Sequence, residues 1–150
     1  MKIGIDFDGT CIPQLPERGI LIGEYDIGAK GVLEELSEAG HEIYLWSCRS
    51  DSPEDPYNWD GKEIREEGCL TYAERWFKER GIPLLTLPQS LSPKPFFDLV
   101  IDDISLGSKM KRREVEYVVL DGTGHVKKCL APSLDWGWAK EQLKKGGYLQ

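Results

Sequence analysis

Two aspartates, Asp6 and Asp8, stand two residues apart in the stretch Ile3-Gly-Ile-Asp-Phe-Asp-Gly-Thr10. The apolar residues before them predict a short strand, and residues two apart on a strand point the same way, so both carboxylates face one small volume. Two close acids are unfavourable unless a cation, a shared proton or a reaction makes use of them. Asp6 can attack an electrophile without an activating base, and Asp8, crowded by Asp6, would hold a proton for a leaving group. Gly9 allows a sharp turn and lets an anion approach its amide.

A solvated acidic turn is the alternative for such a pair, and the chain contains a control. Asp-Gly-Thr recurs at residues 121–123, between the strand-like runs Val115–Leu120 and His125–Leu130. Asp-Gly between two such runs is typical of a β-hairpin. This copy lacks a second acid two residues earlier, so we interpret it as a turn only.

The elements that must position Asp6 and Asp8 alternate between strands and helices. Further strands are predicted at residues 41–46, 84–87 and 96–101, and helical apolar stripes at 29–39, 70–80 and from 136 to about 146. The run 96–101 is nearly continuously apolar, as in strands buried on both faces of a parallel sheet. The alternation predicts an α/β domain with a largely parallel sheet, whose ligands bind beyond the carboxyl ends of the strands.

Polar residues gather at those predicted strand ends. Beside Asp6 and Asp8 they are Ser47, Cys48 and Arg49 after the second strand, Lys94 before the fourth, and Asp102 and Asp103 after the fourth. Their common placement predicts one site at the carboxyl edge of the sheet.

With these groups in this order, the chain resembles the haloacid dehalogenase superfamily, most of whose members are magnesium-dependent phosphatases. Four motifs carry the resemblance: Asp6-Phe-Asp8-Gly-Thr10, Ser47, Lys94 and the pair Asp102-Asp103. The resemblance covers roughly residues 3–106. It implies a three-layer Rossmann-like domain around a central, mostly parallel five-stranded sheet. The first strand would lie in the middle of that sheet, flanked by the second and fourth.

The resemblance also implies a reaction, hydrolysis of a phosphomonoester. Asp6 would attack phosphorus and form an aspartyl-phosphate, while Asp8 would protonate the leaving oxygen and then activate water. Mg²⁺, a hard cation that prefers oxygen ligands, would be held by Asp6, the backbone carbonyl of Asp8, and Asp103. Asp102 would bind the metal directly or orient one of its waters.

The substrate phosphate would be held by Ser47 and Lys94, the lysine offsetting its negative charge, with Cys48 and Arg49 beside them. Taken singly, these residues have simpler explanations. Ser47 would cap the end of its strand, Lys94 would be a solvated loop residue between two prolines, and Arg49 would pair with a neighbouring acid. Three acids converging at strand ends are harder to explain without a cation.

Other functions compete with phosphate hydrolysis. A non-catalytic or regulatory module on the same fold would bind a metal or a partner, but it would not need both Asp6 and Asp8. A phosphoacceptor receiver domain also uses aspartates and a lysine at strand ends, yet its adjacent acid pair follows the first strand. Mutases and dehalogenases of the resembled superfamily stay open, and the substrate is not identified.

Length, composition and net charge limit the class of protein and its partners. A chain of 150 residues that is 40% hydrophobic and 30% charged predicts one domain over residues 1–150. Its net charge of −7 argues against nucleic acid as the main partner. We expect a cytoplasmic protein, because no apolar run reaches the length of a membrane span, no signal peptide is evident, and the four cysteines form no Cys-x-x-Cys pair.

The superfamily often carries a cap domain over its site, and this chain has no room for one. Residues 11–27 and the irregular segment 50–68 are loops, not domains. We therefore expect a site that is open, or covered by the segment 50–68 or by another subunit in a homo-oligomer. Tyr57 and Trp59 lie in that segment, where they would shield an apolar or planar part of the substrate or simply cover the edge of the core. After the fourth strand we expect a C-terminal β-hairpin and helix.

Overall fold

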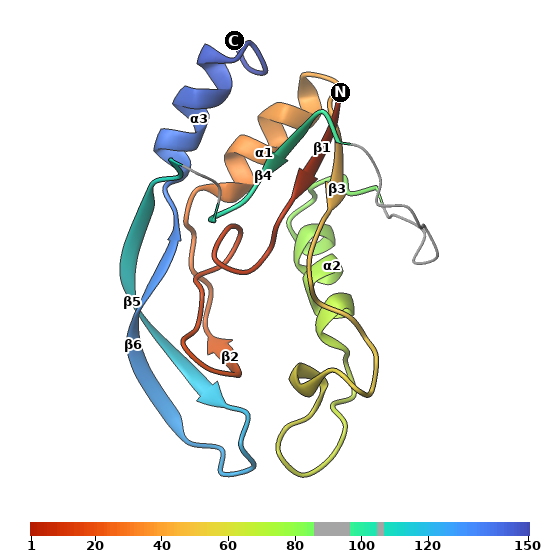
Figure 1. The fold of residues 1–150 in the computed structure, drawn as a ribbon, viewed down its shortest axis with the longest axis vertical. Coiled ribbons are helices and arrows are strands. Elements are labelled where there is room, and N and C mark those ends of the chain that lie inside the picture. The colour runs from red at the N-terminus through yellow and green to blue at the C-terminus, as the bar shows by residue number, and fades with distance from the viewer. Residues whose placement is uncertain (86–96, 105–106) are drawn as a thin grey trace.

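The computed structural model describes residues 1–85, 97–104 and 107–150. These residues form two three-stranded sheets, three α-helices and one 3₁₀ turn (Figure 1). The strands are β1 (Lys2–Ile5), β2 (Gly19–Ile22), β3 (Glu42–Leu45), β4 (Leu99–Ile101), β5 (Met110–Val119) and β6 (Val126–Leu134). The helices are α1 (Ala29–Glu38), α2 (Cys69–Glu79), α3 (Trp136–Lys145) and the 3₁₀ turn η1 (Pro56–Asn58).

The first sheet is parallel and has the order β3-β1-β4. Ile3 of β1 is in register with Ile43 on one side and Leu99 on the other. The first strand thus lies between the second and fourth predicted strands, and the carboxyl ends of all three meet at one edge. The chain leaves β1 at that edge with Asp6, and β4 with Asp102 and Asp103.

The second sheet is antiparallel and has the order β2-β5-β6. The predicted hairpin is confirmed, although both strands extend further than the sequence indicated, because β5 starts at Met110 and β6 continues to Leu134. Asp121 Oδ1 accepts a hydrogen bond from the amide of Thr123, which closes the expected turn. β2 adds a third strand from within residues 11–27, a segment that we had expected to be loop.

The expected five-stranded, mostly parallel central sheet is wrong. Of the predicted third strand only Leu84 and Leu85 are described, and Leu85 makes a single parallel bridge to Tyr44, with its amide 2.7 Å from the carbonyl of Ile43. The longest strands, β5 and β6, follow one another through a tight turn, which allows only antiparallel pairing. They therefore build a separate sheet with β2 and do not widen the parallel one.

The core shows why the three-layer expectation also fails for the described residues. All three helices contribute to one apolar cluster with the side chains of Ile3, Ile5, Ile43 and Ile101 from one face of the parallel sheet. On the opposite face of β1, the ring of Phe97 lies against Gly4 and contacts the rings of Tyr44 and Trp46. β4 is not buried on both faces as predicted, since Val100 is 40% exposed.

The helices follow the predicted apolar stripes closely. Buried positions are Ala29, Val32, Leu33 and Leu36 in α1; Cys69, Ala73, Trp76 and Phe77 in α2; and Trp136, Ala139 and Leu143 in α3. Asp135 caps α3 by accepting from the amide of Trp138. None of the helices in the described part of the chain is long and apolar enough to cross a membrane.

Candidate active site

Asp6 lies at the carboxyl end of β1, where its amide donates to the carbonyl of Ile101 at 3.0 Å. This bond ties the end of β1 to the end of β4, and so brings the carboxyl groups of Asp6 and Asp103 into hydrogen-bonding contact. Burial, the contact with Asp103 and the charge of Asp8 together raise the pKa of Asp6 from 3.8 to about 7, against the opposing effect of the Phe7 amide. Ionisation of Asp6 at neutral pH is therefore unfavourable without a compensating charge.

Gly9 makes room for this pair of acids. Its φ of +75° lies in the left-handed region, and a Cβ added there would be 2.3 Å from Oδ2 of Asp103. The sequence predicted that an anion could approach the amide of Gly9; the structure shows instead that the carboxylate of Asp103 lies where a side chain at this position would be.

Asp8 faces a different partner. Arg49 donates from Nε to Oδ2 of Asp8 at 2.8 Å and from Nη2 to Oδ1 at 2.6 Å, a two-pronged ion pair. The guanidinium also lies over the rings of Phe7 and Tyr72, and its Nη1 donates to the carbonyl of Cys69. Burial alone would lower the pKa of Arg49, but the hydrogen bonds and charge of Asp8 raise it above its ordinary value.

This arrangement differs from the roles that we expected for Asp6 and Asp8. We had expected Asp8 to be crowded by Asp6. Instead the crowding falls on Asp6, through burial and Asp103, while Asp8 is engaged by Arg49. Arg49, predicted to bind substrate, is thus held in the cleft by Asp8, and its side chain is only 17% exposed.

The backbone of the loop after β1 is held from the C-terminal half of the chain. The amide of Leu134 donates to the carbonyl of Gly9 at 2.7 Å, and Nε1 of Trp136 donates to the carbonyl of Thr10 at 2.7 Å. Thr10 is fully buried, and its hydroxyl donates to Oδ2 of Asp6 at 3.3 Å. Sequence reasoning missed these supports. The one signal for them was that the indole N–H of a buried tryptophan needs a partner.

The other predicted residues largely converge on the same place. A cleft of about 550 Å³ is lined by Asp6, Asp8, Gln14, Trp46, Ser47, Cys48, Arg49, Asp55, Pro56, Tyr57, Cys69, Val100, Asp102, Asp103 and Ile104. Ser47 Oγ accepts from the amide of Arg49 at 3.1 Å, so it caps the turn after β3 while facing the cleft. Cys48 is exposed. Lys94 lies outside the described residues.

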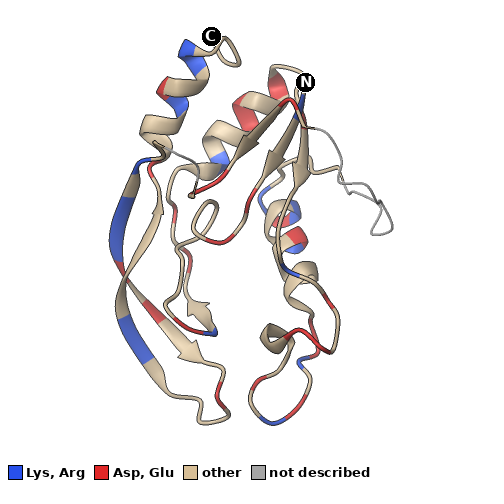
Figure 2. Ribbon diagram, in the orientation of Figure 1, with Lys and Arg blue, Asp and Glu red and all other residues tan. Residues whose placement is uncertain are grey.

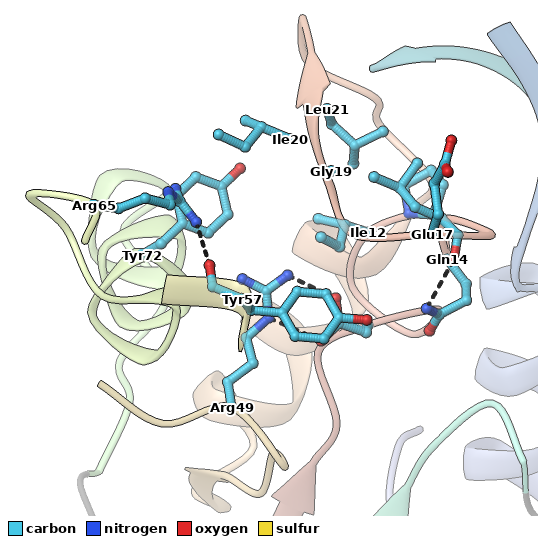
Figure 3. A pocket seen from close by; sticks show the side chains of 13 residues that line it. Ile12, Gln14, Glu17, Gly19, Ile20, Leu21, Arg49, Tyr57, Arg65 and Tyr72 are labelled. Atoms are coloured by element: carbon cyan, nitrogen blue, oxygen red, sulfur yellow. Dashed lines mark hydrogen bonds and ion pairs between the residues drawn. The ribbon is translucent and has the colours of Figure 1, made fainter. Parts of the chain in front are cut away.

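The segment 50–68 forms one wall of this cleft. Its 3₁₀ turn is capped by Asp55, whose Oδ1 accepts from the amide of Tyr57 at 3.0 Å. Arg18, next to β2, donates to the carbonyl of Pro56 at 2.8 Å, and so fastens the segment to the antiparallel sheet. Tyr57 lies at the boundary with a second, narrower pocket (Figure 3). Trp59 instead donates to the carbonyl of Pro53 and is absent from the described lining of the cleft.

Few of the described side chains in the cleft are placed to act together as ligands of a metal ion. Within residues 1–85, 97–104 and 107–150, no group of three or more His, Cys, Asp or Glu side chains comes together closely enough to hold a metal ion. Asp6 and Asp103 are nevertheless paired oxygen donors, and Mg²⁺ is commonly held by one or two carboxylates together with water and substrate phosphate. These two residues therefore fit such an ion. Figure 2 shows acidic residues on the segments that follow β1 and β4, with basic residues along the β5–β6 hairpin.

Comparisons of the chain with protein-family profiles, with curated proteins and with solved structures found no match. The resemblance to the haloacid dehalogenase superfamily therefore stays a prediction from its four motifs.

Proposed function

We propose that the protein is a Mg²⁺-dependent phosphatase that hydrolyses a phosphomonoester through an aspartyl-phosphate on Asp6. The observation that carries the proposal is the contact between the carboxyl groups of Asp6 and Asp103, which together with burial raises the pKa of Asp6 to about 7. Such a pair costs free energy in the folded protein unless a cation or a reaction uses it. Its position at the carboxyl ends of two parallel strands is where α/β proteins bind ligands.

Asp6 and Asp103 would hold the ion, with the backbone carbonyl of Asp8 and the side chain of Asp102 as further candidates. When bound, Mg²⁺ would neutralise the acids and phosphate oxygens, so that one anion can approach another. Its binding would also keep Asp6 ionised at neutral pH, the form in which a carboxylate is a nucleophile.

Asp6 and Asp8 would carry out the two steps of the reaction. An oxygen of Asp6 forms a bond to phosphorus as the bond to the leaving oxygen breaks, and Asp8 gives that oxygen its proton. In the second step, hydrolysis of the aspartyl-phosphate, Asp8 accepts a proton from water, the water oxygen bonds to phosphorus, and the acyl-phosphate bond to Asp6 breaks. In the structure Arg49 engages both carboxylate oxygens of Asp8. A substrate phosphate that competes for the guanidinium would free Asp8 to take up the proton it must deliver.

A non-catalytic binding module is the second candidate, and one observation favours it. Both oxygens of Asp8 are engaged by Arg49, which is how a site would look if Asp8 served only to hold the loop together. The two candidates differ in turnover, since only a phosphatase releases phosphate.

The test is phosphate release from a broad panel of phosphorylated metabolites and from phenyl phosphate, with Mg²⁺ and with a chelator. We expect Mg²⁺-dependent release, and we expect Arg49→Ala to raise KM for the best substrate about tenfold or more with a smaller effect on kcat. Arg75→Ala is the matched control, because Arg75 is an arginine on the surface of α2 that pairs with Glu67 and Glu79. Absence of turnover across the whole panel would favour the binding module.

A further inference from the structure

We propose that the cleft selects phosphomonoesters whose leaving alcohol is planar or apolar and carries no negative charge. This inference rests on the proposed phosphatase function and names its substrate class. Two observations support it: the charge of the cleft and the character of the wall formed by the segment 50–68.

The charge of the cleft is strongly unbalanced. Five aspartates line it, namely Asp6, Asp8, Asp55, Asp102 and Asp103, and Arg49 is the one cation among its described lining residues. The guanidinium is already paired with Asp8. A divalent cation on Asp6 and Asp103 would still leave the described lining negative. The phosphate of the substrate can be compensated by that cation and by Arg49, but a second anionic group on the leaving alcohol would meet uncompensated carboxylates.

Asp55 is the acid best placed to impose this exclusion. Its carboxylate is fixed, because Oδ1 accepts from the amide of Tyr57 and Oδ2 accepts from the hydroxyl of Ser50. It belongs to the segment 50–68 and not to the pair of acids that would hold the cation. Its charge would therefore persist in the complex with metal and substrate.

The rest of the wall is apolar or aromatic. Tyr57 and Trp46 line the cleft together with Val100 and Ile104. Ile104 is 85% exposed and Tyr57 is 43% exposed, so these side chains offer apolar surface that a bound ligand would cover. The ring of Trp46 is held in an edge-to-face contact with Phe97 at 5.6 Å. Apolar and aromatic walls with few polar groups are typical of sites for planar or apolar ligands.

The experiment compares phenyl phosphate with 4-carboxyphenyl phosphate, which differ by one distal carboxylate. That carboxylate does not make the phenol a poorer leaving group, so slower hydrolysis would report on the cleft. We expect kcat/KM for phenyl phosphate to exceed that for 4-carboxyphenyl phosphate by about tenfold or more. The ratio of the two kcat/KM values should decrease as added salt screens the charges. Asp55→Asn keeps the oxygen that caps η1 but removes the charge, and should narrow the ratio several-fold. Glu54→Gln, an exposed neighbour that does not line the cleft in the described structure, is the matched control and should leave the ratio unchanged.

A second readout does not need turnover. Calorimetry with phenylphosphonate and 4-carboxyphenylphosphonate, in the presence of Mg²⁺, should show the same preference in Kd and the same narrowing in Asp55→Asn. If the wild type hydrolyses no ester but binds phenylphosphonate more tightly than 4-carboxyphenylphosphonate, the phosphatase proposal fails and the selectivity stands. If the two phosphonates bind equally, if neither binds, or if Asp55→Asn leaves the preference intact, the selectivity is overturned whatever the outcome of the activity assay.

Discussion

Asp103→Asn is expected to stabilise the metal-free protein above neutral pH while impairing its binding of Mg²⁺. The substitution removes the negative charge in contact with Asp6, but it leaves an oxygen and an amide of the same size against Gly9. The effect depends on the protonation of Asp6, whose pKa in the folded protein is about 7 instead of 3.8.

The sign and size follow from that pKa. Between pH 4 and 7 the folded protein binds a proton that the unfolded chain has lost, so the contribution of Asp6 to stability is full below pH 4 and is lost as pH rises through 7. A rise in pKa from 3.8 to about 7 corresponds to at most roughly 4 kcal/mol, and less for a partly exposed carboxyl. Burial is the largest cause and remains in the variant. The share due to Asp103 is therefore expected to be about 1 kcal/mol, or about 2–4 °C in Tm for a chain of this size.

Urea unfolding with a chelator at pH 5 and pH 8 measures this effect. Asp103→Asn should be more stable than the wild type at pH 8 and equal to it at pH 5, where Asp6 is protonated in both. Asp102→Asn is the matched control, because the electrostatic rise in the pKa of Asp6 comes from Asp103 and Asp8. Addition of Mg²⁺ should stabilise the wild type more than Asp103→Asn. A variant that is less stable at pH 8, or one whose gain does not depend on pH, would refute the reasoning.

Two further substitutions test the geometry of the site. Gly9→Ala should lower the free energy of unfolding by roughly 1–3 kcal/mol, which is more than Gly23→Ala should. Both positions have positive φ, but a Cβ added at Gly9 would lie 2.3 Å from a neighbouring atom, whereas one added at Gly23 would meet nothing within 4 Å. Equal losses in urea unfolding would contradict this. Trp136→Phe keeps an aromatic ring in the core but removes the N–H bonded to the carbonyl of Thr10. As Trp136 would be a positioning residue, kcat should fall about three- to tenfold with little change in KM, and amide exchange in the loop after β1 should accelerate; unchanged exchange would count against that role.

The elements that could be predicted from the sequence are those specified by local patterns. The stripe of α2 ends in Trp76 and Phe77 against the core, and the Asp121-Gly122 turn joins β5 to β6, because helical periodicity and turn chemistry act between near neighbours. The partition into two sheets was not predictable in this way. β2 has four residues and pairs with β5 about a hundred positions away, and nothing in its own sequence specifies that pairing.

The same distinction between local patterns and distant contacts applies to the candidate site. Asp6 and Asp103 could be placed together because both follow apolar strands, and the ends of neighbouring parallel strands meet at one edge. Pairing of Arg49 with a neighbouring acid was one of the two explanations offered by the sequence, but the sequence does not specify which of its many acids is the partner, and the structure shows that it is Asp8. The support of the loop by Trp136 joins residues 126 positions apart, and it depends on how the antiparallel sheet and α3 dock.

The central claim is that Asp6 is the nucleophile of a Mg²⁺-dependent phosphatase, and Asp6→Asn tests it most directly. The amide is of the same size and can still accept from Thr10, so the fold should be retained, which circular dichroism and urea unfolding would verify. With the best substrate of the panel and Mg²⁺, phosphate release by Asp6→Asn is expected to fall by several orders of magnitude. A folded Asp6→Asn protein that keeps more than about one per cent of wild-type turnover would contradict it.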